Sequence, residues 1–207
     1  MTITSGPRRS ATRRRLCEAA TRLMAEQGFS STTVEEIAEH AGVAKGTVYY
    51  NFANKTAIFE ELLRQGVEQL AAALRQAAEE TLKDGGSRID ALDAMIRAGL
   101  LHIDRHPDFT RLYVAEQWRT NRAWHATLLA VRSRSVSVVE EVLREGIAEG
   151  ELSGALDVPV TASALVGMVL VAALDWQAFL PEHSLEDVHR TLSLLVRGRL
   201  AGSARPA

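Results

Sequence analysis

Residues 32–55, TTVEEIAEHAGVAKGTVYYNFANK, decide the fold of this chain because they contain two short helices separated by a glycine turn. Apolar residues of the first half recur at i, i+3, i+4 and i+7, the spacing of one helix face: Val34, Ile37, Ala38 and Ala41. Thr33 with Glu36 forms a capping-box pattern that predicts where this helix starts. Thr32 with Glu35 is the alternative pair, shifted by one residue.

A second short helix is predicted from residue 44 or 45 to Tyr50, after Gly42 ends the first one. Two helices joined by a short turn containing glycine form a helix-turn-helix, whose second helix enters the major groove of DNA. We expect this helix to expose hydrogen-bond donors, one residue without a side chain and two aromatics: Lys45, Gly46, Thr47, Tyr49 and Tyr50. Such a face suits a DNA groove better than solvent. The alternative is that Tyr49 and Tyr50 are core aromatics of a small domain.

The same stretch resembles the DNA-binding domain of the TetR family of bacterial transcriptional regulators. Members typically read T-x-x-x-I-A-x-x-A-G-V-(S/A)-K-G-(T/S)-(L/V)-Y-x-(H/Y)-F-x-x-K, and the chain fits this pattern from Thr33 to Lys55. One departure is Asn51, where the family usually has His or Tyr. The recognisable motif covers about residues 10–57, and the remainder resembles the family in length and helical pattern.

The resemblance implies an all-α fold of about nine helices, with an N-terminal three-helix DNA-binding domain and a larger C-terminal ligand-binding and dimerisation domain. The expected boundaries are a disordered basic arm at 1–9, the DNA-binding domain at 10–54, the helical domain at 55–201 and a disordered tail at 202–207.

The resemblance also assigns roles to residues of the DNA face. The residues expected to position the DNA backbone are Thr33, Tyr49 and Lys55, and those expected nearest the bases are Lys45, Gly46, Thr47 and Tyr50. Ala44 and Asn51 complete the candidate set, and we expect Asn51 to donate to a phosphate.

Composition and charge fit a helical protein with a basic head. The chain has 207 residues, 46% of them hydrophobic, and only five prolines, which gives enough apolar surface for a sizeable core and favours helices. Residues 1–55 hold eight Arg or Lys against five Glu, a net charge of +3, and the whole chain is −2, so the remainder is −5. Because DNA affinity depends on neutralised phosphates, the basic end is the one expected to meet DNA. For the first dozen residues, a merely solvated run of charge is the alternative.

Cysteine content and the absence of an export signal point to the cytoplasm. The resemblance implies a bacterial cytoplasm, with association with the nucleoid when the protein is bound to DNA. Cys17 is the only cysteine, so no intramolecular disulfide forms, and a small buried side chain is expected there rather than a redox sensor. The most apolar run, residues 164–174, is too short to span a bilayer. We therefore expect no membrane partner and a helix buried on most sides.

The remaining helices are predicted from apolar spacing and from breaks at Gly and Pro. Their expected ranges are 10–27, 55–82, 88–105, 108–120, 122–149, 157–179 and a last helix that ends near residue 200. Asn54 and Asp157 are expected N-caps, and Ser184 with Asp187 resembles a capping pair for the last helix.

The last two predicted helices carry wide apolar faces: Leu165, Met168, Val169, Ala172, Trp176, Leu192, Leu195 and Val196. The candidate dimer interface consists of Leu165, Val169, Ala172, Leu192 and Val196. The resemblance points the same way, since family members usually pair through their last two long helices as a four-helix bundle. The alternative is that these faces pack only within the monomer.

Aromatic and polar residues of the middle helices are candidates for a cavity that binds a small molecule. The candidate ligand-binding residues are Met95, Tyr113, Glu116, Gln117, Trp118, His125, Met168, Asp175 and Trp176. In relatives, a small molecule held there changes the spacing of two DNA heads and releases the operator. For each aromatic residue taken alone, a place in the plain core is the favoured alternative.

The sequence therefore predicts a ligand-responsive transcriptional regulator, a repressor that binds a palindromic operator as a homodimer and is released by an effector it does not identify. No enzyme is expected, since the chain has no Gly-rich phosphate loop, metal triad or nucleophile motif. No cofactor or metal is expected either: His102 and His106 have metal-ligand spacing but no third ligand, and are expected to be surface or cap histidines. The alternative is a helical interaction module with a degenerate, non-specific DNA head.

Overall fold

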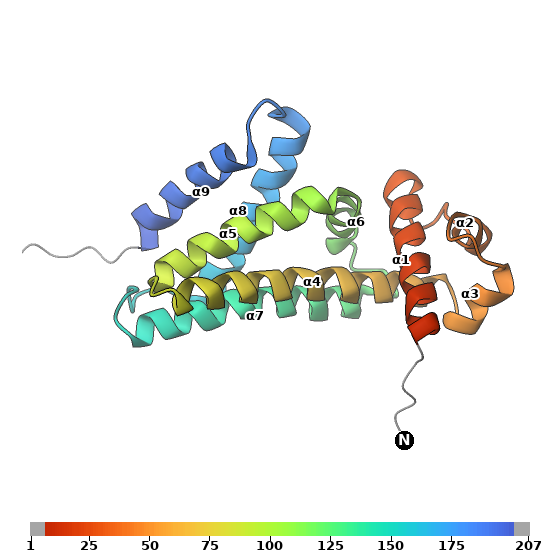
Figure 1. The fold of residues 1–207 in the computed structure, drawn as a ribbon, viewed down its shortest axis with the longest axis horizontal. Helices are drawn as coiled ribbons and strands as arrows, with labels where there is room; N and C mark the ends of the chain where they lie inside the picture. The colour runs from red at the N-terminus through yellow and green to blue at the C-terminus, as the bar shows by residue number, and fades with distance from the viewer. Residues whose placement is uncertain (1–6, 201–207) are drawn as a thin grey trace, which may run out of the picture. The chain divides into compact units, whose positions relative to one another are not determined.

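The computed structural model describes residues 7–200, and within them the chain forms nine α-helices and no strand (Figure 1). The helices are α1 (Pro7–Gln27), α2 (Val34–His40), α3 (Lys45–Asn51), α4 (Lys55–Lys83), α5 (Arg88–Arg105), α6 (Pro107–Gln117), α7 (His125–Ala148), α8 (Val158–Phe179) and α9 (Leu185–Leu200). The predicted all-α fold is confirmed.

The start of α2 is fixed by the capping box at Thr33. The Thr33 hydroxyl accepts from the backbone N–H of Glu36 at 3.2 Å, and the Glu36 carboxylate accepts from the backbone N–H of Thr33 at 2.7 Å. The alternative start at Thr32 is wrong, because Thr32 is buried and its hydroxyl donates to the Gly28 carbonyl at 2.9 Å. The predicted caps at Asn54, Asp157 and Ser184 are also present.

Two helix boundaries differ from the sequence prediction. Residues 7–9, expected to be disordered, belong to α1, where proline is well suited to the first turn because it needs no backbone N–H there. Helix α6 ends at residue 117 and α7 starts at 125, so a turn occupies residues 118–124, part of which was expected to be helical. Residues 1–6 of the predicted arm and the predicted tail lie outside the described residues.

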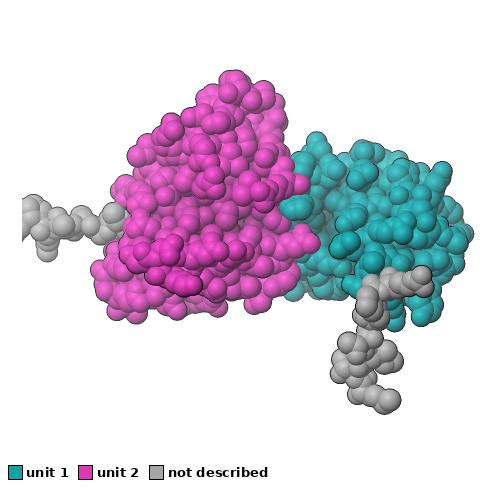
Figure 2. Space-filling model, viewed as in Figure 1, with its two compact units in different colours: residues 1–66, 106–131 teal, residues 67–105, 132–207 magenta. Residues whose placement is uncertain are grey.

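The chain divides into two compact units (Figure 2). Unit 1 comprises residues 1–66 and 106–131, and unit 2 comprises residues 67–105 and 132–207. This is a division by packing, and the functional boundary expected at residue 54 remains a prediction.

Unit 1 is built around the N-terminal helices and α6. Buried apolar residues of α1, α2 and α3 include Leu16, Ile37 and Val48. Below them Phe59 packs against Phe29 and Trp124, with ring centroids 5.4 and 4.7 Å away. Helix α6 packs against α1 in the same unit. The three N-terminal helices are therefore held by side chains from α4 and from the turn that precedes α7.

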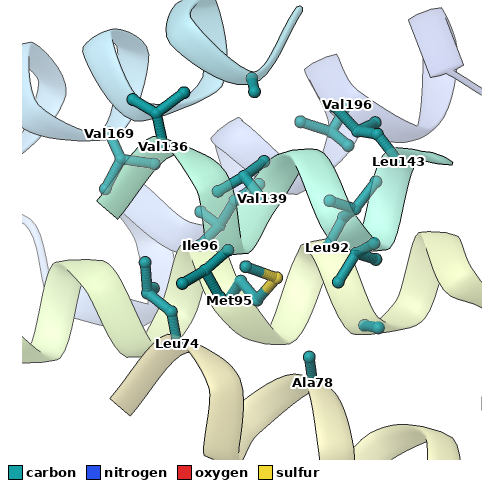
Figure 3. Packing of buried hydrophobic residues seen from close by; sticks show 14 of the residues in the cluster. Leu74, Ala78, Leu92, Met95, Ile96, Val136, Val139, Leu143, Val169 and Val196 are labelled. Carbon is teal, nitrogen blue, oxygen red and sulfur yellow. The ribbon is translucent and has the colours of Figure 1, made fainter. Parts of the chain in front are cut away.

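Unit 2 has a separate core made by α4, α5, α7, α8 and α9 (Figure 3). The labelled residues come from all five helices: Leu74, Ala78, Leu92, Met95, Ile96, Val136, Val139, Leu143, Val169 and Val196. Helix α5 lies against both α8 and α9. These contacts bury one stripe of each of the last two helices.

Helix α8 is less buried than the sequence indicated. It is long and apolar enough to cross a membrane by length and composition, yet only 17% of its most apolar stretch is buried in the chain. The expectation of a helix buried on most sides is wrong, because only the stripe facing α5 and α9 is covered. The apolar run was expected to be too short to span a bilayer, but the helix that contains it has 22 residues, which is long enough. Length and composition alone are weak signs of a membrane helix.

Cys17 is a core side chain of α1, in agreement with its expected structural role. It is buried among the apolar residues of unit 1. Burial raises the pKa of the Cys17 thiol to about 12. The thiol is therefore protonated at neutral pH, which makes it a poor nucleophile and a poor redox sensor.

Candidate nucleic-acid interface

The turn between α2 and α3 depends on Gly42. Its φ is +62°, in the left-handed region that favours glycine. The backbone N–H of Val43 donates to the Ala38 carbonyl and that of Gly42 donates to the Glu39 carbonyl, both at 2.9 Å. This pair of hydrogen bonds is the Schellman motif that ends a helix. It sets the direction in which α3 leaves the turn.

Helix α3 has one inner and one outer face. Val48 and the following Phe52 are buried in the core of unit 1. Tyr49 and Tyr50 are 51% and 73% exposed, and the alternative that they are core aromatics is therefore wrong. The exposed face of α3 is defined as Ala44, Lys45, Gly46, Tyr49 and Tyr50, with Thr47 half-buried beside them. It has the composition expected of a groove-reading surface.

Gly46 lies in the first turn of α3, and the protein itself gives no reason for glycine there. A Cβ added at Gly46 would have no heavy atom within 4 Å. Its backbone is helical, so the left-handed conformation is not needed either. A glycine in a helix costs about 0.5–1 kcal/mol relative to alanine. A partner that approaches the backbone closely from outside accounts for that cost.

Lys45 is not a free cation in this structure. Its ammonium pairs with the carboxylate of Glu35 on α2. The hydrogen bond from Lys45 lowers the pKa of Glu35, and the same contact raises the pKa of Lys45. Both groups are exposed, so a DNA phosphate or base edge can replace the carboxylate. Glu35 is a residue of this surface that the sequence analysis missed.

Lys45→Ala tests what this side chain contacts. If Lys45 meets a guanine edge, we expect about 5- to 150-fold weaker operator binding, the value of one good base contact. If it meets a phosphate, the main effect is a shallower salt dependence. Glu35→Gln is the complementary variant, and it should tighten binding because it removes a negative charge beside the DNA. Titrations of labelled operator at several salt concentrations measure both, and unchanged affinity with an unchanged salt slope in Lys45→Ala would remove Lys45 from the site.

Asn51 does not take the expected place on the DNA face. It is buried, and its side-chain amide donates to the Thr47 carbonyl at 2.8 Å. The backbone carbonyl of Asn51 accepts from the Arg13 side chain at 2.7 Å. The expected phosphate contact is therefore corrected: Asn51 joins α3 to α1. Thr33 is exposed, but its hydroxyl donates to Glu36 at 2.8 Å within the capping box.

Lys55 has an internal role that the sequence did not reveal. Its ammonium donates to the carbonyls of Phe29 and Thr32 at 2.6 and 2.5 Å. It also lies 4.4 Å from the centre of the Phe29 ring. Burial lowers the pKa of Lys55. The side chain thus fastens the start of α4 to the turn between α1 and α2, and a contact to DNA stays a prediction.

Lys55→Met is expected to lower the free energy of unfolding, which a residue that only contacted DNA would not do. It leaves the carbonyls of Phe29 and Thr32 without this donor, at a cost of about 1–3 kcal/mol. Chemical denaturation of the variant beside Lys45→Ala measures the difference. We expect Lys45→Ala to unfold like the wild type and Lys55→Met to unfold earlier; equal midpoints would mean that these hydrogen bonds carry no stability.

Arginines of α1 also divide into internal and exposed groups. Arg15 donates to the carbonyl of Ala41 and Arg13 pairs with Glu61 at 3.3 Å, so both hold other elements to α1. Arg9 lies 5.4 Å from the ring of Tyr50, beside the exposed face of α3. Arg9 is a second candidate that the sequence analysis did not single out. Only part of the predicted basic head is therefore available to DNA.

The candidate ligand-binding residues are divided between the two units. Tyr113, Glu116, Gln117, Trp118 and His125 belong to unit 1, and Met95, Met168, Asp175 and Trp176 belong to unit 2. Met95 is a core side chain (Figure 3), and Trp118 and Asp175 are exposed. The Trp176 indole N–H donates to the His183 carbonyl at 2.7 Å. Among these residues, Glu116 lines a cavity found in unit 1.

The candidate dimer residues are mostly internal. Val169, Leu192 and Val196 are buried in the core of unit 2, and Leu165 and Ala172 are partly buried against it. The apolar residues that remain exposed on and near α8 and α9 lie on other sides of the helices. They form the α8–α9 apolar surface, defined as Val160, Val171, Phe179, Leu180, Leu194 and Leu195.

Histidines give no sign of a metal site. His102 is buried on α5, which corrects the expectation of a surface or cap position. His106 is exposed at the N-cap position of α6, as expected, although its side chain makes no capping hydrogen bond. No group of three or more metal-binding side chains occurs among the residues that the structure describes.

Comparisons with known proteins agree with this geometry. Residues 16–62 match a family model described as bacterial regulatory proteins of the tetR family, and residues 85–176 match one described as a tetracyclin repressor-like C-terminal domain. The transcriptional repressor KstR2 of Mycobacterium tuberculosis is 30% identical over 144 residues, which are 69% of this chain and 70% of that protein. The fatty acid metabolism regulator protein of Bacillus subtilis is 24% identical over 184 residues, 88% of this chain and 93% of that protein.

Solved structures show the same fold at lower identity. The regulator FadR from Bacillus subtilis, solved in complex with stearoyl-CoA, has a TM-score of 0.77 at 22% identity, covering 88% of this chain and 96% of that one. The fatty acid degradation regulator FadR from Bacillus halodurans has a TM-score of 0.81 at 20% identity and covers 99% of this chain and 100% of that one.

Proposed function

The chain belongs to the TetR family of bacterial regulatory proteins, and from this premise we propose that it represses transcription by inserting the exposed face of α3 into the major groove of an operator. It is a DNA-binding, ligand-responsive regulator, as its relatives are. The residues proposed to contact DNA are Ala44, Lys45, Gly46, Thr47, Tyr49 and Tyr50, with Arg9, Thr33 and Lys55 beside them.

One observation carries this proposal: α3 keeps a glycine that nothing in the protein requires. Gly46 has open space where a Cβ would lie, and exposed Lys45 and Tyr50 lie on the same face. In the major groove, a residue without a side chain allows the backbone to approach, and lysine and tyrosine can donate to bases or phosphates. A surface that only interacted with solvent would have no use for this combination.

We propose further that two copies act together. A helix of seven residues reads only a few base pairs, and a two-fold dimer doubles the site by placing two helices about one DNA turn apart. The α8–α9 apolar surface supports this proposal, because six large apolar side chains are exposed on the same pair of helices. Large apolar side chains left exposed on one pair of elements favour an interaction site over plain solvent exposure.

The effector is proposed to favour a dimer whose DNA heads no longer match the half-site spacing, a shift of population between two states. Its identity stays open. Stearoyl-CoA is the first compound to test, because it is the ligand of one structural relative and two others are regulators of fatty acid metabolism or degradation by name. We place the protein in the cytoplasm, where relatives of this family act.

Gel-shift experiments with the DNA upstream of the gene separate this function from the alternative of an interaction module with a degenerate head. We expect a salt-sensitive shift that survives excess unrelated duplex and that disappears with the correct effector. Binding of equal strength to every duplex contradicts the proposal. The comparisons do not favour that alternative, since the relatives are transcriptional regulators by name.

A further inference from the structure

Unit 1 contains a cavity of about 390 Å³ between the end of α1, the turn that follows it, and α6. Its charged lining comes from Arg111, Glu116, Arg119 and Arg122, and the turn contributes Ser30 and Ser31. None of these residues belongs to the exposed face of α3. The cavity therefore needs an explanation apart from DNA binding.

Glu116 is the unusual residue of this cavity. It is only 5% exposed, yet its Oε2 atom accepts no hydrogen bond. The nearest cationic atoms are Nη1 of Arg119, 3.6 Å from Oε1, and Nε of Arg122, 3.7 Å from Oε2. Both distances are too long for good hydrogen bonds. A buried carboxylate is costly unless donors satisfy it, so a missing donor at this position calls for a partner.

Other unsatisfied groups lie next to Glu116 in the chain. Within the part of the chain that the structure describes, eight buried side-chain nitrogen or oxygen atoms lack a hydrogen-bond partner, and four of them lie between residues 116 and 125. These four are Glu116 Oε2, Arg122 Nε, Trp124 Nε1 and His125 Nδ1. Folded proteins leave few such groups per hundred residues. Two of the four, Glu116 and Arg122, line the cavity, so a ligand there can supply their missing partners.

We propose that this cavity binds a small organic anion that also carries a hydroxyl or amino group. Arg119 and Arg122 supply charge-assisted donors for its carboxylate or phosphate oxygens. Glu116 can only accept, so it selects a ligand with an O–H or N–H. Arg111 adds a third positive charge, although it is paired with Asp108 at 2.6 Å. The arginines outnumber the single carboxylate, which favours an anionic ligand over a cationic one.

Ligand binding here would connect α6 to the turn that leads into the helix-turn-helix. Ser30 and Ser31 line the cavity and stand shortly before Thr33, the cap of α2. A ligand that contacts both sides stabilises one arrangement of that turn against α6. The site is thus a second input to DNA binding, within the DNA-binding unit itself.

Two pairs of probes test the site on the full chain, by thermal shift and by isothermal titration at matched ionic strength. L-malate is compared with succinate, and glycerol 3-phosphate with propyl phosphate, so that each pair differs by hydroxyl groups. We expect the hydroxylated member of at least one pair to bind and to raise the melting temperature more than its partner. The pair that responds identifies the anion as carboxylate or phosphate. No response to any probe, or equal responses within both pairs, overturns the proposal.

Two variants locate the binding. Arg122→Gln is expected to lower the affinity for the responding probe by about tenfold or more, the value of a hydrogen bond to a charged group. Glu116→Met should abolish the preference for the hydroxylated member, because it removes both acceptor oxygens at similar side-chain size. Arg64→Gln and Glu79→Gln are exposed controls with the same charge changes.

Probe binding that neither cavity variant changes would contradict the site. Operator binding by each variant shows that the variant is folded. If the wild type binds operator but none of the probes, the proposed anion site is refuted and the proposed function is not. If the wild type binds a probe but no operator, the proposed function is refuted and the anion site is not.

Discussion

Gly46→Ala is expected to fold with equal or higher stability than the wild type and to bind the operator about 5- to 150-fold more weakly. Alanine is the better helix former by about 0.5–1 kcal/mol, and its Cβ meets no protein atom within 4 Å. In the complex the same methyl group lies where the backbone approaches DNA, and overfilling a packed contact costs about 1–3 kcal/mol. Thermal unfolding measures the first effect, and fluorescence anisotropy with labelled operator measures the second.

Gly42→Ala is the matched control, since it makes the same change four residues earlier. Gly42 has φ +62°, a conformation that costs a residue with a side chain about 1–2 kcal/mol. A Cβ there would also lie 3.0 Å from Nη2 of Arg15. This variant should lose stability, whereas Gly46→Ala should not. Wild-type operator affinity in Gly46→Ala would show that the exposed face of α3 does not enter the groove.

The double variant Val171→Glu, Leu194→Glu is expected to be monomeric and to lose operator binding by about 100-fold or more. The two side chains are 58% and 69% exposed in the single chain, so charge should be tolerated by the monomer. Burying carboxylates against a second copy is costly because each one must lose its hydration. Without the dimer, the second half-site contact is no longer intramolecular, and its effective concentration is lost. Analytical ultracentrifugation and operator titration are the two measurements.

Leu129→Glu provides the control for this surface. Leu129 is 56% exposed on α7, within unit 1, and it is not part of the α8–α9 apolar surface. The control should sediment and bind operator like the wild type. A double variant that remains dimeric with full operator affinity would place the interface elsewhere.

The N-terminal helices could be predicted almost residue by residue because their determinants are local. The capping box at Thr33, the turn at Gly42 and the apolar spacing of α2 all lie within a few residues of one another. The role of Lys55 could not be predicted, because it depends on a contact with Phe29, which is distant in sequence. The buried position of Asn51 could not be predicted either, because α1 covers it and Arg13 of that helix donates to its backbone carbonyl. Resemblance identified the positions but not their partners.

The buried faces of the C-terminal helices were harder to predict, for a different physical reason. Helix α8 is apolar on nearly all sides, so its sequence has no periodicity that points to one face. Packing against α5 decides that Val169 is inside and Val171 outside, and this choice could not be predicted from the sequence. The candidate ligand residues stay a prediction, and one of them, Met95, belongs to the core of unit 2.

Methylation protection of guanine N7 on the upstream DNA tests the central claim most directly, because this atom faces the major groove. We expect two groups of protected guanines about one helical turn apart, and we expect both groups to lose protection when Gly46→Ala replaces the wild type at a concentration that just saturates the operator with wild type. Retarded DNA with no protected guanines, or with protection that follows neither sequence nor spacing, would contradict it.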